Sequence, residues 1–211
     1  IEIKAYFKKQ LMNLFSDSEI KQISNHAIKT RLKLSQADLI LADDVRLSES
    51  DLLYFRSIVK RLQANEPMQY VFGDTEFYGL TMKCDSRALI PRPETEELVA
   101  WILEDIKKDT PIEGLQILDM CTGSGCIALA LKSQLKNATV SAFDWSQEAL
   151  DLTYENSQNL KLALNIQKLD ALSDFNSWDF ETASFDVWVS NPPYIPLKEK
   201  NLMEFWRKQE T

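Results

Sequence analysis

The stretch Ile117-Leu118-Asp119-Met120-Cys121-Thr122-Gly123-Ser124-Gly125 carries the strongest structural signal in the chain. Its pattern is that of a buried strand ending near a carboxylate, then a turn of small residues that leads into a helix. The protein has 5 glycines in 211 residues, and two of them stand in this turn. Because glycine permits positive φ and the close approach of a ligand, the turn is predicted to bind one. A plain tight turn is the structural alternative.

Strand and helix patterns alternate on the C-terminal side of this turn. The expected strands cover residues 115–120, 138–144, 166–170 and 185–190, and the expected helices cover 124–136 and 146–160. This alternation is typical of a parallel sheet covered by helices on both faces, so the fold class is α/β. Upstream, Pro93 is well placed to begin another helix, because its fixed φ suits the first helical turn.

The first third of the chain predicts a small helical bundle instead. Apolar residues recur at helical spacing from Ile3 to Leu62. Capping-box patterns mark three helix starts, at Ser16/Glu19, Ser35/Asp38 and Ser48/Asp51. Residues 68–90 then read as a β-hairpin with a turn signal at Gly73-Asp74. We therefore expect a helical bundle at 1–66, a hairpin linker at 67–92 and an α/β domain at 93–211.

Charge and composition exclude several classes of function. Residues 1–66 hold 11 basic and 9 acidic side chains, whereas the rest hold 13 and 23, so direct nucleic-acid binding by the second part is disfavoured. The three cysteines form no Cys-x-x-Cys pair, and the single histidine, His26, is expected to be far from any partner, so no metal site is predicted. No apolar run reaches bilayer length and no secretion signal opens the chain, which predicts a cytoplasmic protein without a membrane partner.

Two ligand classes fit the glycine turn. The pattern Gly123-x-Gly125-x-x-Ala128 matches the dinucleotide fingerprint, with Asp144 at about the expected distance for a ribose carboxylate. Asp119 favours S-adenosyl-L-methionine, since a carboxylate there would face a sulfonium or an ammonium group more readily than a pyrophosphate. No lysine follows the glycines, which excludes a P-loop.

Acidic residues also end the next two expected strands. Asp144 offers two oxygens that can accept both hydroxyls of a ribose, and its alternative role is to cap the helix that begins near Ser146. Asp170 could accept a hydrogen bond from the adenine amino group, and its alternative is an ordinary acidic residue in a loop.

The tetrapeptide Asn191-Pro192-Pro193-Tyr194, after the fourth expected strand, indicates the chemistry. The prolines stiffen the backbone and remove two donors, so carbonyl groups are left facing the crevice at the end of the strand. A planar amide or amino nitrogen is a poor nucleophile, because its lone pair is delocalised. The Asn191 side chain and the Pro192 carbonyl can accept hydrogen bonds from its two N–H protons, which pushes electron density back onto the nitrogen. Tyr194 can stack on the planar group and orient it. A strand-ending turn is the structural alternative.

With the segment Arg87-Ala88-Leu89-Ile90-Pro91-Arg92-Pro93-Glu94-Thr95-Glu96, these motifs resemble the methyltransferases that modify the glutamine of the Gly-Gly-Gln motif in bacterial peptide-chain release factors. The resemblance runs from the helical bundle to about Lys200. It implies a class I, Rossmann-like methyltransferase domain that converts S-adenosyl-L-methionine to S-adenosyl-L-homocysteine, preceded by a bundle that docks the release factor.

The resemblance also assigns site residues. The implied cofactor loop comprises Cys121, Thr122, Gly123, Ser124 and Gly125. Asp144 is then the ribose ligand, and Asp170 with Ala171 forms the adenine edge. The glutamine amide is held by Asn191, Pro192, Pro193 and Tyr194, and the segment 91–96 lines the cleft.

The chain departs from the family pattern in three places. Cys121 replaces a glycine, which predicts a negative φ there. Ala171 stands where some relatives have an aromatic residue, which predicts weaker stacking on adenine. Only 17 residues follow Tyr194, so we expect a truncated or frameshifted chain without its C-terminal strands. The strand with Val187 and Val189 would then be an open edge, and activity would be impaired unless something covers it.

Release-factor glutamine methylation is thus the leading hypothesis. An adenine-amino nucleic-acid methyltransferase is the alternative, because such enzymes share the Asn191–Tyr194 motif. A truncated cofactor-binding fragment without activity is a third possibility, and a nicotinamide-dependent oxidoreductase is a distant fourth.

Overall fold

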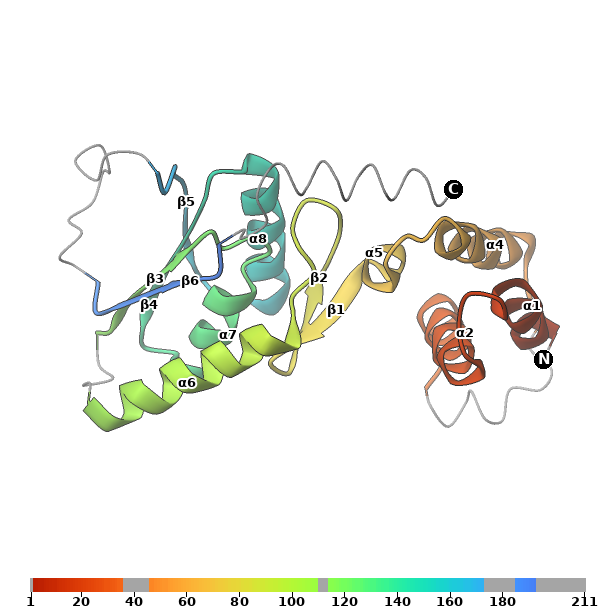
Figure 1. The fold of residues 1–211 in the computed structure, drawn as a ribbon, viewed down its shortest axis with the longest axis horizontal. Coiled ribbons are helices and arrows are strands. Elements are labelled where there is room, and N and C mark those ends of the chain that lie inside the picture. Colours follow the sequence, from red (N-terminus) through yellow and green to blue (C-terminus); the bar gives the residue numbers. More distant parts are fainter. Residues whose placement is uncertain (1, 36–45, 110–113, 173–184, 193–211) are drawn as a thin grey trace. The chain divides into compact units, whose positions relative to one another are not determined.

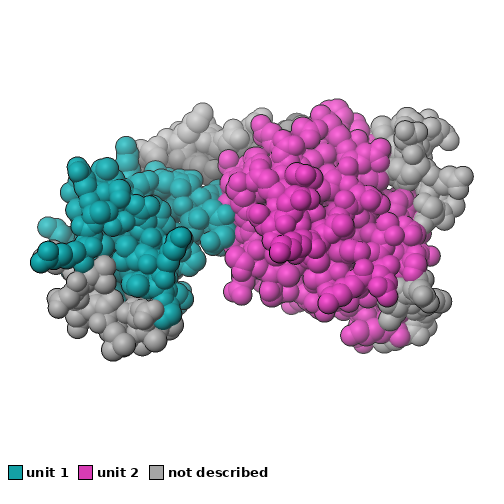
Figure 2. Space-filling view, turned by 180° about the vertical axis from the view of Figure 1, so that it is seen from behind, with its two compact units in different colours: residues 1–74 teal, residues 75–211 magenta. Residues whose placement is uncertain are grey.

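The computed structural model describes residues 2–35, 46–109, 114–172 and 185–192. The chain divides into two compact units, residues 1–74 and residues 75–211 (Figure 2). Asp38, Pro193 and Tyr194 lie outside the described residues. The predicted capping box at Ser35/Asp38 and the last two residues of the proline motif are therefore not part of the description.

The first unit contains the helices α1 (Glu2–Leu11), α2 (Asp17–Leu32), α4 (Glu49–Gln63) and α5 (Met68–Phe72) (Figure 1). Ser16 and Ser48 form the predicted capping boxes at the starts of α2 and α4. The core of the unit is built on Phe7 and Phe55, which are fully buried and meet edge to face with ring centroids 6.0 Å apart. The predicted bundle is therefore present.

Residues 68–72 form a short helix, so the prediction of a strand here was wrong. Val71 is buried in the core of the first unit, and Arg61 donates hydrogen bonds to the carbonyls of Tyr70 and Val71, both at 2.8 Å. Gly73, at φ 83°, then closes the helix, with its N–H bonded to the Gln69 carbonyl. The Gly73-Asp74 signal thus marks the end of a helix and not a hairpin turn.

The hairpin itself begins just afterwards, with β1 (Asp74–Phe77) and β2 (Leu80–Lys83). Tyr78 and Gly79 connect the two strands with φ values of 49° and 74°. Two consecutive positive φ values are typical of a type I′ turn, whose twist matches that of the flanking strands.

The second unit is built on a parallel sheet in the order β5-β4-β3-β6. Its strands are β3 (Gln116–Met120), β4 (Thr139–Asp144), β5 (Asn165–Lys168) and β6 (Val187–Ser190), within two residues of their predicted bounds. Its helices are α6 (Pro93–Asp109), α7 (Cys126–Gln134) and α8 (Gln147–Leu160). The α/β fold class and the helix start at Pro93 are confirmed.

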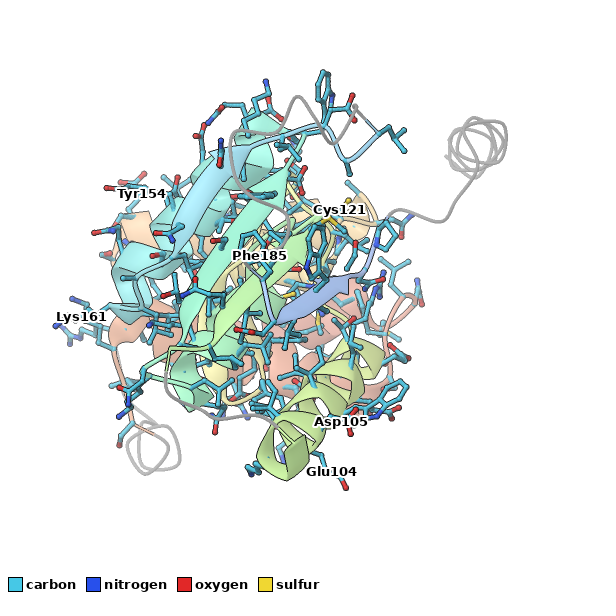
Figure 3. The ribbon with its side chains drawn as sticks, turned by 90° about the vertical axis from the view of Figure 1, so that its left-hand side faces the viewer. Glu104, Asp105, Cys121, Tyr154, Lys161 and Phe185 are labelled. Carbon is cyan, nitrogen blue, oxygen red and sulfur yellow. The ribbon has the colours of Figure 1, made fainter. Side chains whose placement is uncertain are left out.

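The three helices lie on one side of the sheet in both ribbon views (Figures 1 and 3). The chain moves from β3 to β4 to β5 in one direction, and right-handed connections in one direction place α7 and α8 on the same face. The prediction of helices on both faces is therefore not met within the described part of the chain. No described helix is both long enough and apolar enough to span a bilayer.

Candidate functional site

The order of the strands creates a switch point at the end of β3. From β3 the chain moves away through β4 and β5, and it then returns to place β6 on the other side of β3. Met120 and Ser190 are paired across these two strands, and the Ser190 hydroxyl donates to the Met120 carbonyl at 2.8 Å. Ligands of open α/β sheets bind at such points. Cys121 (labelled in Figure 3) and Asn191, the residues that follow these two paired strands, therefore stand at the same edge of the sheet.

Asp119 lies at this edge of the sheet and is fully buried. Its Oδ2 accepts hydrogen bonds from the Thr122 hydroxyl at 2.6 Å and from the Ala128 N–H at 3.2 Å, while its Oδ1 has no partner within the described residues. Burial raises the pKa of Asp119 to about 7. The two hydrogen bonds of Oδ2 join the loop to the first turn of α7.

The loop between β3 and α7 has a left-handed backbone at three positions. Cys121, Gly123 and Gly125 have φ values of 58°, 60° and 81°. The prediction of a negative φ at Cys121 was wrong, because the chain must turn sharply between the end of β3 and the start of α7. At Gly125 a side chain is also excluded by space, since an added Cβ would lie 2.8 Å from Thr153 Cγ2. The glycine cluster is therefore a requirement of this turn.

Side chains of neighbouring elements hold the loop in place. Asp144, at the end of β4, accepts the Gly123 N–H at 2.9 Å through Oδ2, and it accepts the Ser146 N–H at 2.9 Å through Oδ1. On α8, Thr153 donates its hydroxyl to the Gly123 carbonyl at 2.9 Å. These bonds tie the loop to β4 and α8. The cap of α8 itself is Ser146, whose side chain accepts the Ala149 N–H, and Asp144 accepts the backbone N–H of that cap residue.

The segment before α6 covers the same loop. A Cβ added at Gly123 would meet Ala88 Cβ at 3.8 Å, which is ordinary contact. Arg87 pairs with Asp85 and with Glu155 of α8, both at 2.8 Å. Hydrogen bonds from Arg87 and Lys83 lower the pKa of Glu155 to about 2. These contacts give the Arg87–Glu96 motif a structural basis, because its first residues fasten the segment to the domain that carries the loop.

Asp170 and Ala171 follow β5 at the same edge of the sheet. Asp170 lies two residues beyond the strand, and its Oδ1 accepts the Leu172 N–H at 2.9 Å. The Leu169 N–H donates to the Asp144 carbonyl at 3.0 Å, so the ends of β4 and β5 stay together. Trp145, which sequence reasoning did not select, has 66% of its surface exposed beside them. Its position directly after Asp144, a candidate site residue, is the feature of the sequence that could have indicated Trp145 as well.

Asn191 is the residue of the proline motif whose contacts are described. Its Nδ2 donates to the Thr95 hydroxyl of α6 at 3.1 Å. Its Oδ1 accepts no hydrogen bond within the described residues. Asn191 and Pro192 are both exposed. The bond to Thr95 joins Asn191 to α6 at the edge of the sheet where β6 ends.

His26 lies outside this site, in the first unit. Its Nε2 is 3.7 Å from Asp74 Oδ1, and its ring packs edge to face on Phe72 with centroids 4.4 Å apart. These two contacts are with a carboxylate and an aromatic ring of the same unit.

Comparison with known proteins gives two family matches. The Methyltransferase small domain model matches residues 99–207, and the PrmC N-terminal domain model matches residues 23–73. The release factor glutamine methyltransferase of Flavobacterium psychrophilum is 35% identical over 209 residues, which cover 96% of this chain and 71% of that protein. The protein of the same name from Bacteroides thetaiotaomicron is 36% identical over 202 residues, covering 96% and 70%.

Solved structures show a more distant likeness. The tRNA (uracil-54, C5)-methyltransferase of Pyrococcus abyssi, in complex with S-adenosyl-L-homocysteine, has 17% sequence identity and a TM-score of 0.43, covering 57% of this chain and 27% of that one.

Proposed function

The chain belongs to the release factor glutamine methyltransferase family, and we propose that it moves a methyl group from S-adenosyl-L-methionine to the side-chain amide nitrogen of a release-factor glutamine. The observation that carries this proposal is the pairing of Met120 with Ser190, which brings the glycine loop and Asn191 to one crevice. One side of that crevice can hold a donor, and the other side offers acceptors to the group that is methylated.

The residues of the loop suit this cofactor better than a dinucleotide. Asp144 still has lone pairs for the two hydroxyls of a ribose, because a carboxylate has about four acceptor positions and its bonds to Gly123 and Ser146 use two. A second carboxyl, Asp119, lies buried under the loop, where its charged form would disfavour a nearby pyrophosphate. We assign the cofactor to Cys121–Gly125 and Asp144, with Asp170 and Ala171 at the adenine edge. When bound there, S-adenosyl-L-methionine supplies an electrophilic methyl group on a sulfonium.

Asn191 and Pro192 act on the substrate amide. The Asn191 Oδ1 and the Pro192 carbonyl accept the two N–H groups of the glutamine side chain, which raises the electron density on its nitrogen and fixes its direction. An amide that is held in line needs no strong base, since its extra proton can leave after the transfer. Pro193 and Tyr194 complete the proposed substrate site, with Tyr194 stacked on the amide plane.

The first unit is proposed to dock the release factor. It exposes several large apolar side chains, with exposed fractions from 39% to 60%: Met12, Leu14, Leu52 and Leu53. We propose these side chains as the candidates for contact with the release factor. Because release factors act in translation, we place the activity in the cytoplasm.

A transfer assay with the full chain tests the proposal. Methyl-labelled S-adenosyl-L-methionine is offered with a release factor, with the same factor carrying glutamate in place of the Gly-Gly-Gln glutamine, and with double-stranded DNA. We expect label in the first protein alone. Label in DNA would support the adenine-amino alternative. Cofactor binding, measured by calorimetry, without transfer to any acceptor would support a cofactor-binding fragment. Either result would overturn the proposed function.

A further inference from the structure

Thr95 stands where it can decide which end of the Asn191 amide faces the crevice. It is the third residue of α6 and is 6% exposed. Its hydroxyl accepts the Nδ2 proton of Asn191 at 3.1 Å, although the two residues are 96 positions apart in the sequence. Within the described residues, this is the single hydrogen bond of the Asn191 side chain.

An asparagine amide has two ends of opposite hydrogen-bonding character and nearly the same shape. The carbonyl end accepts, and the NH₂ end donates. A substrate amide nitrogen brings donors only, so it needs the carbonyl end in the crevice, and a rotated Asn191 would oppose donor to donor. In the structure the Thr95 hydroxyl accepts from Nδ2, so the carbonyl end of the Asn191 amide is the end left for a ligand.

The hydroxyl is itself held on a rigid support. Threonine is branched at Cβ, which restricts χ1, and the side chain of Thr95 is buried. The Thr95 N–H bonds to the Arg92 carbonyl at 2.9 Å, and the neighbouring Glu96 accepts the Tyr78 N–H of the hairpin turn at 2.8 Å. Asn191, in contrast, is exposed and follows the end of β6, so its orientation depends on an external contact.

We propose that Thr95 is a positioning residue for methyl transfer: its hydroxyl holds Nδ2 of Asn191, so that Oδ1 is presented to the amide that is methylated. The inference rests on the proposed function and adds a role for a residue of the Arg87–Glu96 motif. It also predicts selectivity, because the fixed acceptor favours an amide substrate over a carboxylate.

The first experiment uses Thr95→Val, which keeps the side-chain shape and removes the hydroxyl. We expect kcat toward the release factor to fall about five- to tenfold, as for the loss of one neutral hydrogen bond, with the dissociation constant for S-adenosyl-L-methionine unchanged. Thr95→Ser, which keeps the hydroxyl, should retain most of the activity. Thr81→Val, the same change on an exposed position of β2, is the matched control. Equal kcat in Thr95→Val and the wild type, or equal losses in the serine and valine variants, would overturn the inference.

A second readout concerns selectivity and is insensitive to a general loss of packing. Peptides with Gly-Gly-Gln and with Gly-Gly-Glu are compared as competitors of the release factor. The wild type should prefer the glutamine peptide, and Thr95→Val should lose most of that preference, because a free Asn191 can turn its NH₂ end toward a carboxylate. An unchanged preference would contradict the inference.

A spectroscopic measurement separates this inference from the proposed function. In ¹⁵N-labelled protein, the Asn191 side-chain NH₂ signals are identified through their loss in Asn191→Asp. Their exchange with water should be slow in the wild type and fast in Thr95→Val, with or without methyl transfer. If the wild-type chain transfers no methyl group, the proposed function fails, while the exchange rates still decide whether Thr95 orients Asn191. Identical exchange in both proteins would refute the orienting role.

Discussion

The carboxylate of Asp144 accepts the backbone N–H of Gly123 at 2.9 Å, which ties the end of β4 to the glycine loop that follows the neighbouring strand β3. The same carboxylate accepts the Ser146 N–H at the start of α8. One side chain thus orients two loops of the crevice. Bonds of this kind, with a charged acceptor, are stronger than neutral ones.

We expect Asp144→Ala to weaken the binding of S-adenosyl-L-methionine by about tenfold or more, since a hydrogen bond to a charged group contributes about 1.5–3 kcal/mol. Calorimetric titration measures the effect. Asp186→Ala is the matched control, because Asp186 accepts the Gln116 N–H at 2.8 Å at the opposite end of β3. The control should bind the cofactor normally. Equal weakening in both variants would show that the effect is general destabilisation.

The buried carboxyl of Asp119 predicts a pH dependence of stability. Its pKa is raised from 3.8 to about 7 by burial, so the folded state binds one more proton than the unfolded state between these values. Its contribution to stability is therefore fully present below about pH 3.8 and is lost as the pH rises toward 7, at up to about 1.4 kcal/mol per pH unit. Asp119→Asn should remove this slope.

Urea unfolding of the wild type and Asp119→Asn at several pH values between 4.5 and 8 checks this prediction. As the pH rises, the free energy of unfolding of the wild type should fall relative to that of Asp119→Asn. A difference that is constant across the range would mean that Asp119 does not titrate there.

The left-handed backbone at Cys121 predicts a stabilising substitution. A non-glycine residue at φ 58° costs about 1 kcal/mol, so Cys121→Gly should raise the free energy of unfolding by about 0.5–1 kcal/mol. Cys126→Gly is the control, because Cys126 is helical and packs against the core, and glycine should lower stability there. Thermal and urea unfolding measure both, and the same sign for the two variants would disprove the argument.

Gly125 should not tolerate even the smallest side chain. Gly125→Ala combines φ 81° with a contact of 2.8 Å to Thr153, so we expect a loss of more than about 2 kcal/mol together with weaker cofactor binding. Gly73→Ala has nearly the same φ with nothing within 4 Å, so it should show the backbone cost alone, about 1 kcal/mol. The difference between the two in urea unfolding isolates the steric clash. Equal losses would indicate that Thr153 moves aside.

Local patterns predicted most of the fold. The alternation of strand and helix segments predicted the four strands within two residues of their bounds, and Ser16 and Ser48 identified two helix starts through their capping boxes. The pattern failed at residues 70–72, where a short apolar run fits a strand or a helical turn equally well. Burial of Val71 in the core of the first unit and the hydrogen bonds from Arg61, ten residues before Val71, decide that conformation, and neither is visible in the pattern of residues 70–72.

The sequence by itself determined which residues end strands, because side-chain periodicity and turn chemistry are local. That was sufficient to select Asp144, the glycine loop and Asn191 as site candidates. It could not determine the order of the strands, which places β6 beside β3 and so joins the glycine loop to Asn191. It also could not show that Asp119 is turned inward or that Thr95 meets Asn191. These contacts exist only once α6 and the sheet have packed, since hydrogen bonds between side chains 96 residues apart leave no periodic signal in a single sequence.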